Sequence, residues 1–214
     1  MNWQEWIRQS LPHTEIMRGG ATVWQAGAQG LIGDTLGPVL HLHDGASEIF
    51  YFVSGRCRLE VGDSEQIFNP ADFTLVPPQV PHNLWNAADE DLLVFWIVAP
   101  HLQEAKWRTE DISPAEMQRR IQRARVEPGA ILPSDANIRS RLVTLGAQQS
   151  LSERTRPGQE VVLYVASGQA QVRVGKLGGR LDSNDFVHVP ADTAYTVAAE
   201  SSPASVLVFQ MPGV

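Results

Sequence analysis

The stretch that decides the fold runs from His41 to Gly55 and reads HLHDGASEIFYFVSG. Its two histidines stand one residue apart. Since alternate side chains of an extended strand lie on the same face, His41 and His43 point in the same direction. The DGAS sequence that follows is typical of a tight turn, which would bring Glu48 beside the two histidines on the next strand. Three side chains able to bind one metal ion are therefore expected to converge here.

A third histidine, His82, follows some forty residues later and completes a set of four candidate ligands. Imidazole and carboxylate groups suit Fe, Mn, Ni, Cu or Zn better than Ca or Mg. We therefore expect one divalent transition metal per chain. Four protein ligands leave one or two positions open on a metal that prefers five or six, and an open position is typical of a catalytic site.

Two segments around these residues resemble the two motifs of the cupin family. They read His41-x-His43-x4-Glu48-x6-Gly55 and Ala71-Asp72-x4-Pro77-x4-His82-x3-Asn86. The resemblance implies a small β-barrel, a double-stranded β-helix of jelly-roll type. It also implies that His41, His43, Glu48 and His82 face the barrel interior as metal ligands. The family usually has glycine at the turn positions that Ala71 and Gln79 occupy here.

The chain also contains an internal repeat. A shift of 113 residues superposes most turn and strand landmarks of its two halves. Tyr51–Gly55 then falls on Tyr164–Gly168, Asp72-Phe73 on Asp185-Phe186, Val76-Pro77 on Val189-Pro190, and the closing strand Leu93–Val98 on Val206–Met211. The chain thus resembles a bicupin.

The same shift predicts that the second repeat lacks the metal site. It places Arg154 at the position of His41, Arg156 at that of His43, Val161 at that of Glu48 and Tyr195 at that of His82. None of the four ligands is kept, so the second barrel is expected to be metal-free. We interpret Arg154 and Arg156 as solvated charges in preference to an anion site, because arginines are mostly exposed.

The expected fold is all-β, with two tandem cupin barrels joined by a short α-helical linker. The predicted boundaries are 1–110 for the first barrel, 111–130 for the linker and 131–214 for the second barrel. Residues 112–126 carry the helix signals, with Ser113 as the cap and Pro114 in the first turn. Elsewhere short apolar runs alternate with turn residues, as in small barrels.

Composition excludes several classes of partner. The chain has 214 residues and a net charge of −7, which argues against nucleic acids and anionic membrane surfaces. It has no signal-peptide pattern, and its single cysteine, Cys57, cannot form an internal disulfide, so we expect a cytoplasmic protein. Cys57 is interpreted as a buried strand residue. A homodimer through barrel edges is possible, because exposed strand edges tend to be covered.

The predicted function is a metal-dependent oxygenase of dioxygenase type acting on a small organic substrate. Glu48 would be a ligand, a general base or both. By strand parity, Phe50, Phe52, Leu84 and Asn86 are the candidates for contact with the substrate, although the three apolar residues equally fit a packed barrel core. Two alternatives stay open. One is a non-enzymatic barrel that binds or senses a small molecule, and the other is a non-oxidative isomerase or decarboxylase.

Overall fold

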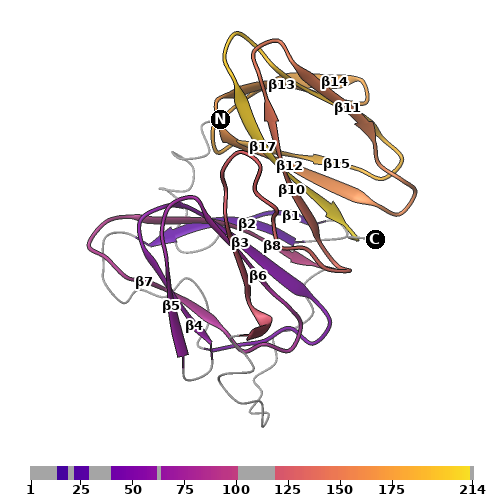
Figure 1. Ribbon diagram of the computed structural model, residues 1–214. Helices are drawn as coiled ribbons and strands as arrows, with labels where there is room; N and C mark the ends of the chain where they lie inside the picture. The colour runs from indigo at the N-terminus through magenta and orange to yellow at the C-terminus, as the bar shows by residue number, and fades with distance from the viewer. Residues whose placement is uncertain (1–13, 19–21, 29–39, 62–63, 101–118, 213–214) are drawn as a thin grey trace. The chain divides into compact units, whose positions relative to one another are not determined.

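The structure is a computed structural model that describes residues 14–18, 22–28, 40–61, 64–100 and 119–212. It divides into two compact units, Met1–Val126 and Glu127–Val214. The described residues are built almost entirely from antiparallel strands, which confirms the all-β fold (Figure 1). Among them, no helix has the length and hydropathy that a membrane span requires.

The first unit consists of two sheets. The larger has the strand order β1-β2-β8-β3-β6-β9 and the smaller the order β5-β4-β7. The nine strands are β1 (Thr14–Arg18), β2 (Thr22–Ala28), β3 (Ser47–Ser54), β4 (Cys57–Val61), β5 (Ser64–Phe68), β6 (Asp72–Val76), β7 (Asn83–Asn86), β8 (Leu92–Ala99) and β9 (Gln122–Arg125).

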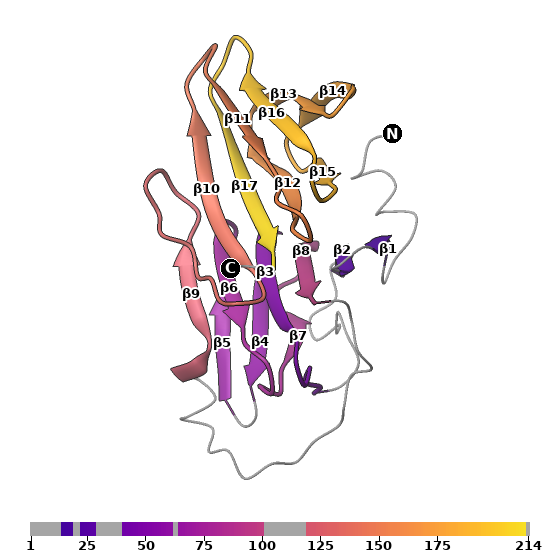
Figure 2. The ribbon, with the colours of Figure 1, turned by 90° about the vertical axis from the view of Figure 1, so that its right-hand side faces the viewer.

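The second unit has two four-stranded sheets, with the orders β10-β17-β12-β15 and β11-β16-β13-β14. Figure 2 shows β10, β17 and β12 side by side in the first of them. The strands are β10 (Arg139–Leu145), β11 (Ser150–Arg154), β12 (Glu160–Ser167), β13 (Gln169–Val174), β14 (Leu177–Asp182), β15 (Phe186–Val189), β16 (Ala194–Ala199) and β17 (Ala204–Met211).

Each unit packs an apolar core of side chains from both of its sheets. In β4 the burial alternates residue by residue, with Cys57, Leu59 and Val61 inside, as the period of a strand requires. This confirms that Cys57 is a buried strand residue, and burial raises the pKa of its thiol. The core of the second unit is built in the same way, around Val161, Leu163 and Val197.

The repeat is confirmed by the strand register, with one correction. Glu48 pairs with Val76 and Val161 with Val189, a shift of 113 for both partners. The closing strands differ, because Ser47 pairs with Ala99 whereas Glu160 pairs with Met211, which gives a shift of 112 for β8 and β17. The predicted match of Leu93–Val98 with Val206–Met211 is therefore wrong by one residue. Residues 200–203 connect β16 to β17 where the longer 87–91 connects β7 to β8.

The predicted linker helix is wrong over its last part. Arg119 and Arg120 are helical, and residues 112–118 lie outside the described part of the chain, but Gln122–Arg125 form β9. This strand pairs with β6, whose residues are all buried and whose backbone would otherwise be an open sheet edge. Pairing with this edge outweighs the local helix signals, since tertiary context overrides propensity.

Candidate metal centre

Four buried side chains of the first unit converge on one point. One ligand atom from each of His41, His43, Glu48 and His82 lies within 4.8 Å of the others. All four residues belong to the buried set. The structure thus brings together the four residues that the sequence pattern singled out, and the cluster could hold one metal ion.

Both sheets of the unit contribute to this cluster. Glu48 lies on β3 in the larger sheet, and His82 comes directly before β7 of the smaller sheet. His41 is held opposite His82 by an isolated β-bridge, in which each backbone N–H donates to the other residue's carbonyl at 3.1 and 2.8 Å. His43 is held by its own carbonyl, which accepts a hydrogen bond from the backbone N–H of Gln79 at 2.8 Å.

The Glu48 carboxylate is the centre of the polar contacts. Its Oε2 atom lies 3.0 Å from His43 Nε2 and 2.7 Å from His82 Nε2. On its other side, the His82 ring donates from Nδ1 to the carbonyl of Val80 at 2.8 Å. Such a second hydrogen bond fixes the orientation of the ring and aims Nε2 at the cluster.

Burial and hydrogen bonding act in opposite directions on the pKa values of this pair. Burial by itself would raise the pKa of Glu48, but the hydrogen bonds and charges of His43 and His82 outweigh it and lower that pKa well below its usual range. Burial would likewise lower the pKa of His43, and the contact with Glu48 raises it instead. The carboxylate is therefore ionised, and it provides negative charge at the centre of the cluster.

These residues fit a divalent transition metal. Three imidazoles and one carboxylate are the donor set that such metals accept. Two imidazole nitrogens already point at one carboxylate oxygen, as they would toward a shared cation. In addition, His43 Nδ1 is buried and has no hydrogen-bond partner among the described residues.

Comparison with known proteins agrees with this geometry. Residues 32–98 match the family model of the cupin domain. This chain carries a cupin domain. No curated protein matches it, whereas many solved structures do.

Three of these structures illustrate the cupin fold of the whole chain. The cupin 2 conserved barrel domain protein from Leptotrichia buccalis has 14% identity over 99% of this chain and 95% of its own, with a TM-score of 0.67. Salicylate 1,2-dioxygenase from Pseudoaminobacter salicylatoxidans has 12% identity over 90% and 71%, with a TM-score of 0.65. Bacillus subtilis oxalate decarboxylase has 14% identity over 90% and 68%, with a TM-score of 0.60. At these identities the likeness shows a shared fold.

The residues predicted to contact a substrate occupy different surroundings in this cupin. The Phe50 ring lies 5.9 Å from that of His82, centroid to centroid, next to the cluster. Phe52 lies deeper and stacks on Phe68 at 4.7 Å, and Leu84 belongs to the same apolar core. Asn86 holds a loop, since its side chain donates to the carbonyl of Glu90 at 3.1 Å.

Trp96 is a neighbour of the site that the sequence patterns did not single out. It pairs in register with Phe50, and the two rings lie 6.3 Å apart. The available signal was its place in the closing apolar strand, where parity puts it on the interior face with Val94 and Val98. Phe50 and Trp96 together form an apolar layer that begins at the ring of His82.

Two turns that position the ligands have left-handed backbone at residues other than glycine. Ala71 has φ 68° and Gln79 has φ 64°. These are the positions at which cupins usually have glycine, so the turns keep their shape although the residue type differs. Gln79 is the residue whose N–H holds His43, which links this turn directly to the site.

In the second unit the backbone pairing corrects one predicted equivalence. His41 lies opposite His82 across the bridge, whereas Tyr195, the counterpart of His82, pairs with Glu153. Glu153, rather than Arg154, therefore occupies the place of His41. The shift of 113 misses this because Glu153 lies eight positions before Val161, whereas His41 lies seven positions before Glu48, so the second unit has one residue more in this segment. Among the described residues, the only cluster with metal-ligand character is the one in the first unit.

Proposed function

We propose that the first barrel binds one divalent transition metal ion through His41, His43, Glu48 and His82 and acts as an oxygenase on a small organic substrate. The observation that carries this proposal is the convergence of four buried ligand atoms from two sheets within 4.8 Å. Hydrogen bonds to the backbone carbonyls of His43 and Val80 and the bridge between His41 and His82 hold the three histidines in place. Such support keeps ligand side chains in a defined orientation.

When bound, a redox-active metal of this kind supplies a site for dioxygen and for a chelating substrate. The residues of the chain supply orientation and proton transfer. His82 is fixed by the carbonyl of Val80, and Glu48, ionised and in contact with two histidines, is placed to ligate the metal or to accept a proton from the substrate. Phe50 and Trp96 are buried and provide apolar surface beside His82.

The comparisons support more than one reaction class. One similar structure is a salicylate 1,2-dioxygenase and another an oxalate decarboxylase. The apolar layer of Phe50 and Trp96 favours a substrate with an apolar part, which suits oxidation of a hydrocarbon portion better than removal of carboxylate from a fully polar acid. Oxygenase chemistry is therefore the first activity to test.

The first experiment is elemental analysis of the purified protein and of two single variants. We expect about one transition metal ion per chain in the native protein and loss of that ion in His82→Ala, since the variant removes a ligand and its support. His188→Ala is the matched control. His188 is a half-buried histidine paired with Glu160 in the second unit, outside the cluster. Equal metal content in all three proteins would refute the site.

The second experiment measures the reaction of the metal-loaded protein with a panel of aromatic and aliphatic hydroxy acids and phenols. Oxygen uptake that depends on both substrate and His82 supports the oxygenase. Release of carbon dioxide without oxygen uptake would replace it by a decarboxylase. Tight binding of a panel compound without turnover would replace it by a metal-dependent binding or sensing barrel.

A further inference from the structure

Three polar residues of the second barrel lie on the strand faces that carry its apolar core. Arg141 alternates along β10 with Val143 and Leu145, which pack on the core of that barrel. By the same parity, Glu153 shares its face of β11 with Leu151, and Tyr195 is itself 3% exposed and part of the core. These residues are called the Arg–Glu–Tyr triad.

The triad is held together by its own contacts. One oxygen of Glu153, Oε2, accepts hydrogen bonds from both Arg141 Nη2 and the Tyr195 hydroxyl. Arg141 Nη2 also lies 3.5 Å from the tyrosine oxygen. Glu153 therefore has two donors, and they come from two different strands. Arg141 stands in the sheet β10-β17-β12-β15, and its two partners stand in the sheet β11-β16-β13-β14, so the triad joins the two sheets.

The place of the triad corresponds to the candidate metal centre of the first barrel. There His82 directly precedes β7 of the smaller sheet and Glu48 lies on β3 of the larger sheet, so that cluster also joins two sheets. In the second barrel Glu153 pairs with Tyr195 at the equivalent register. Val161, which stands at the position of Glu48, is apolar and fully buried. The group that joins this sheet to the other is therefore Arg141 on β10, which is separated from β12 by β17.

We propose that the Arg–Glu–Tyr triad replaces the metal centre in the second barrel. It would join the two sheets of this barrel without a metal, and the barrel would serve as a structural unit. The guanidinium provides the positive charge that a metal ion would provide, and the carboxylate accepts from it and from the tyrosine. Glu153 Oε2 binds Nη2 of Arg141 and the hydroxyl of Tyr195, so the two donors that face the carboxylate are both paired with it. The proposal goes beyond the oxygenase activity and does not depend on it.

Substitution of one member of such a triad is expected to lower the stability of the second barrel. Removing a partner leaves a half-buried charged group or the buried Tyr195 hydroxyl without its hydrogen bond. Arg141 and Glu153 have side chains that are 33% and 29% exposed, so water reaches them only in part. Burial and the negative charge of Glu153 raise the pKa of Tyr195, which keeps its hydroxyl protonated as the donor.

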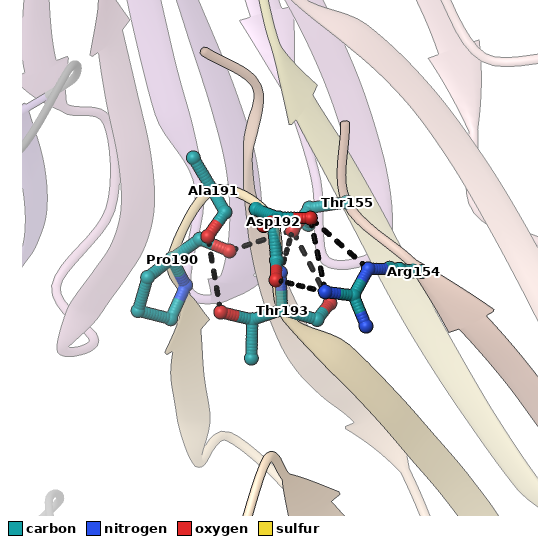
Figure 3. A network of polar contacts seen from close by, with 6 residues as sticks. All are labelled: Arg154, Thr155, Pro190, Ala191, Asp192 and Thr193. Carbon is teal, nitrogen blue, oxygen red and sulfur yellow. Dashed lines mark hydrogen bonds and ion pairs between the residues drawn. The ribbon is translucent and has the colours of Figure 1, made fainter. Parts of the chain in front are cut away.

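A second ion pair nearby provides a control. Arg154 donates from Nε and Nη2 to Asp192 Oδ1 at 3.1 and 3.0 Å, and Nη2 also donates to the Asp192 carbonyl at 2.8 Å (Figure 3). Arg154 adjoins Glu153 on the same strand, but on its outer face. The side chains of Arg154 and Asp192 are 60% and 66% exposed, and exposed pairs contribute little. The sequence interpretation of Arg154 as a solvated charge agrees with this exposure.

The test is amide hydrogen exchange of the full chain, followed in peptides that cover β11 and β16. We expect Glu153→Gln and Tyr195→Phe each to speed exchange there by about tenfold or more, whereas Asp192→Asn changes it by less than about threefold. The double variant is expected to fall short of the product of the two single effects, because both remove parts of one network. A metal chelator is expected to leave exchange in these peptides unchanged.

Three results would overturn the proposal. The first is exchange in Glu153→Gln no faster than in Asp192→Asn. The second is a double variant whose effect equals the product of the single ones, which would mean that the residues act independently. The third is a chelator effect on β11 and β16 in the native protein, which would mean that the second barrel depends on a metal after all. Should Glu153→Gln not fold, the Tyr195→Phe comparison, which removes one hydroxyl only, decides the matter.

Discussion

Gly55 shows how a single residue holds the first barrel together. Its φ is +76°, and a Cβ at this position would lie 2.6 Å from the carbonyl oxygen of Asp91 and 2.8 Å from the Cα of Leu92. Both neighbours are backbone atoms that cannot rotate away. Only glycine therefore allows the turn after β3 to approach the start of β8.

We predict that Gly55→Ala destabilises the first unit far more than a left-handed backbone alone would. The strain of an alanine at positive φ is about 1–2 kcal/mol, and the backbone clash adds to it. Gly158→Ala is the matched control, because Gly158 has φ +74° and nothing within 4 Å of a Cβ. Urea unfolding of the two variants measures the difference, and equal losses of unfolding free energy would contradict this account of Gly55.

Residue patterns predicted the cluster well and its surroundings less well. His41, His43 and Glu48 are close in sequence, so strand parity and one turn suffice to bring them together. Parity could not tell Phe50, which lies against His82, from Phe52, which stacks on Phe68 in the core. That difference is one of depth along the barrel. Depth depends on which strands pair and in what register, which no local pattern contains.

At the scale of elements, β9 is the clearest disagreement between sequence and structure. Its sequence QRAR follows convincing helix signals, and arginines near a helix C-terminus are favourable. In the structure Arg123 and Arg125 instead lie within ion-pair distance of Asp72, at 2.5 and 3.6 Å. The partner that determines this strand is some fifty residues earlier in the chain. For that reason, signals within the linker could not reveal it.

Asp72 is therefore predicted to stabilise β9. The buried carboxylate accepts hydrogen bonds from the backbone N–H of Asn69 at 2.7 Å and from Arg123. Asp72→Asn removes the charge and one acceptor, so we expect a loss of about 2 kcal/mol in the local opening free energy of residues 122–125. Hydrogen exchange of a peptide covering β9 measures it. Glu65→Gln, which removes an exposed partner of Arg58 in the same unit, should leave that peptide unchanged, and a similar effect of both variants would refute the role of Asp72.

The second element to test is β11, through its pH dependence. Burial would raise the pKa of Glu153, but the hydrogen bonds from Arg141 and Tyr195 outweigh it and lower that pKa below its ordinary value of 4.5. A carboxyl whose folded pKa is lowered adds stability above its unfolded pKa, and this stability is lost as the pH falls through the folded value. Urea unfolding with pulsed exchange at one fixed labelling pH should show β11 and β16 losing stability below about pH 4.5. Glu153→Gln should be less stable at neutral pH and should lack that component. An unchanged acid dependence in the variant would assign it to other groups.

At the scale of the whole molecule, the repeat is visible in the sequence because equivalent turns of the two units have the same spacing and backbone conformation. Gly55 and Gly168 both have positive φ, as do Ala71 and Asn184, and each pair is separated by 113 residues. The candidate metal centre does not follow the repeat, since the equivalent place in the second unit has Glu153, Tyr195 and an arginine from another strand. A shift alone could not predict that exchange. It arises from side chains that cross the barrel between sheets.

A metal centre in the first barrel and the Arg–Glu–Tyr triad in the second together predict that a bound metal stabilises only the first unit. All six tryptophans lie between residues 3 and 107, so their fluorescence reports on the first unit. A divalent transition metal at one hundred times its dissociation constant should raise the unfolding free energy followed by tryptophan by about 2.7 kcal/mol. Exchange in β3 and β7 should slow in parallel, because Glu48 and His82 adjoin the site, whereas β12 and β16 should not respond. His188→Ala should behave as the native protein and His82→Ala should lose the effect. Metal protection of β12 and β16, or its persistence in His82→Ala, would place the bound ion outside the cluster of His41, His43, Glu48 and His82.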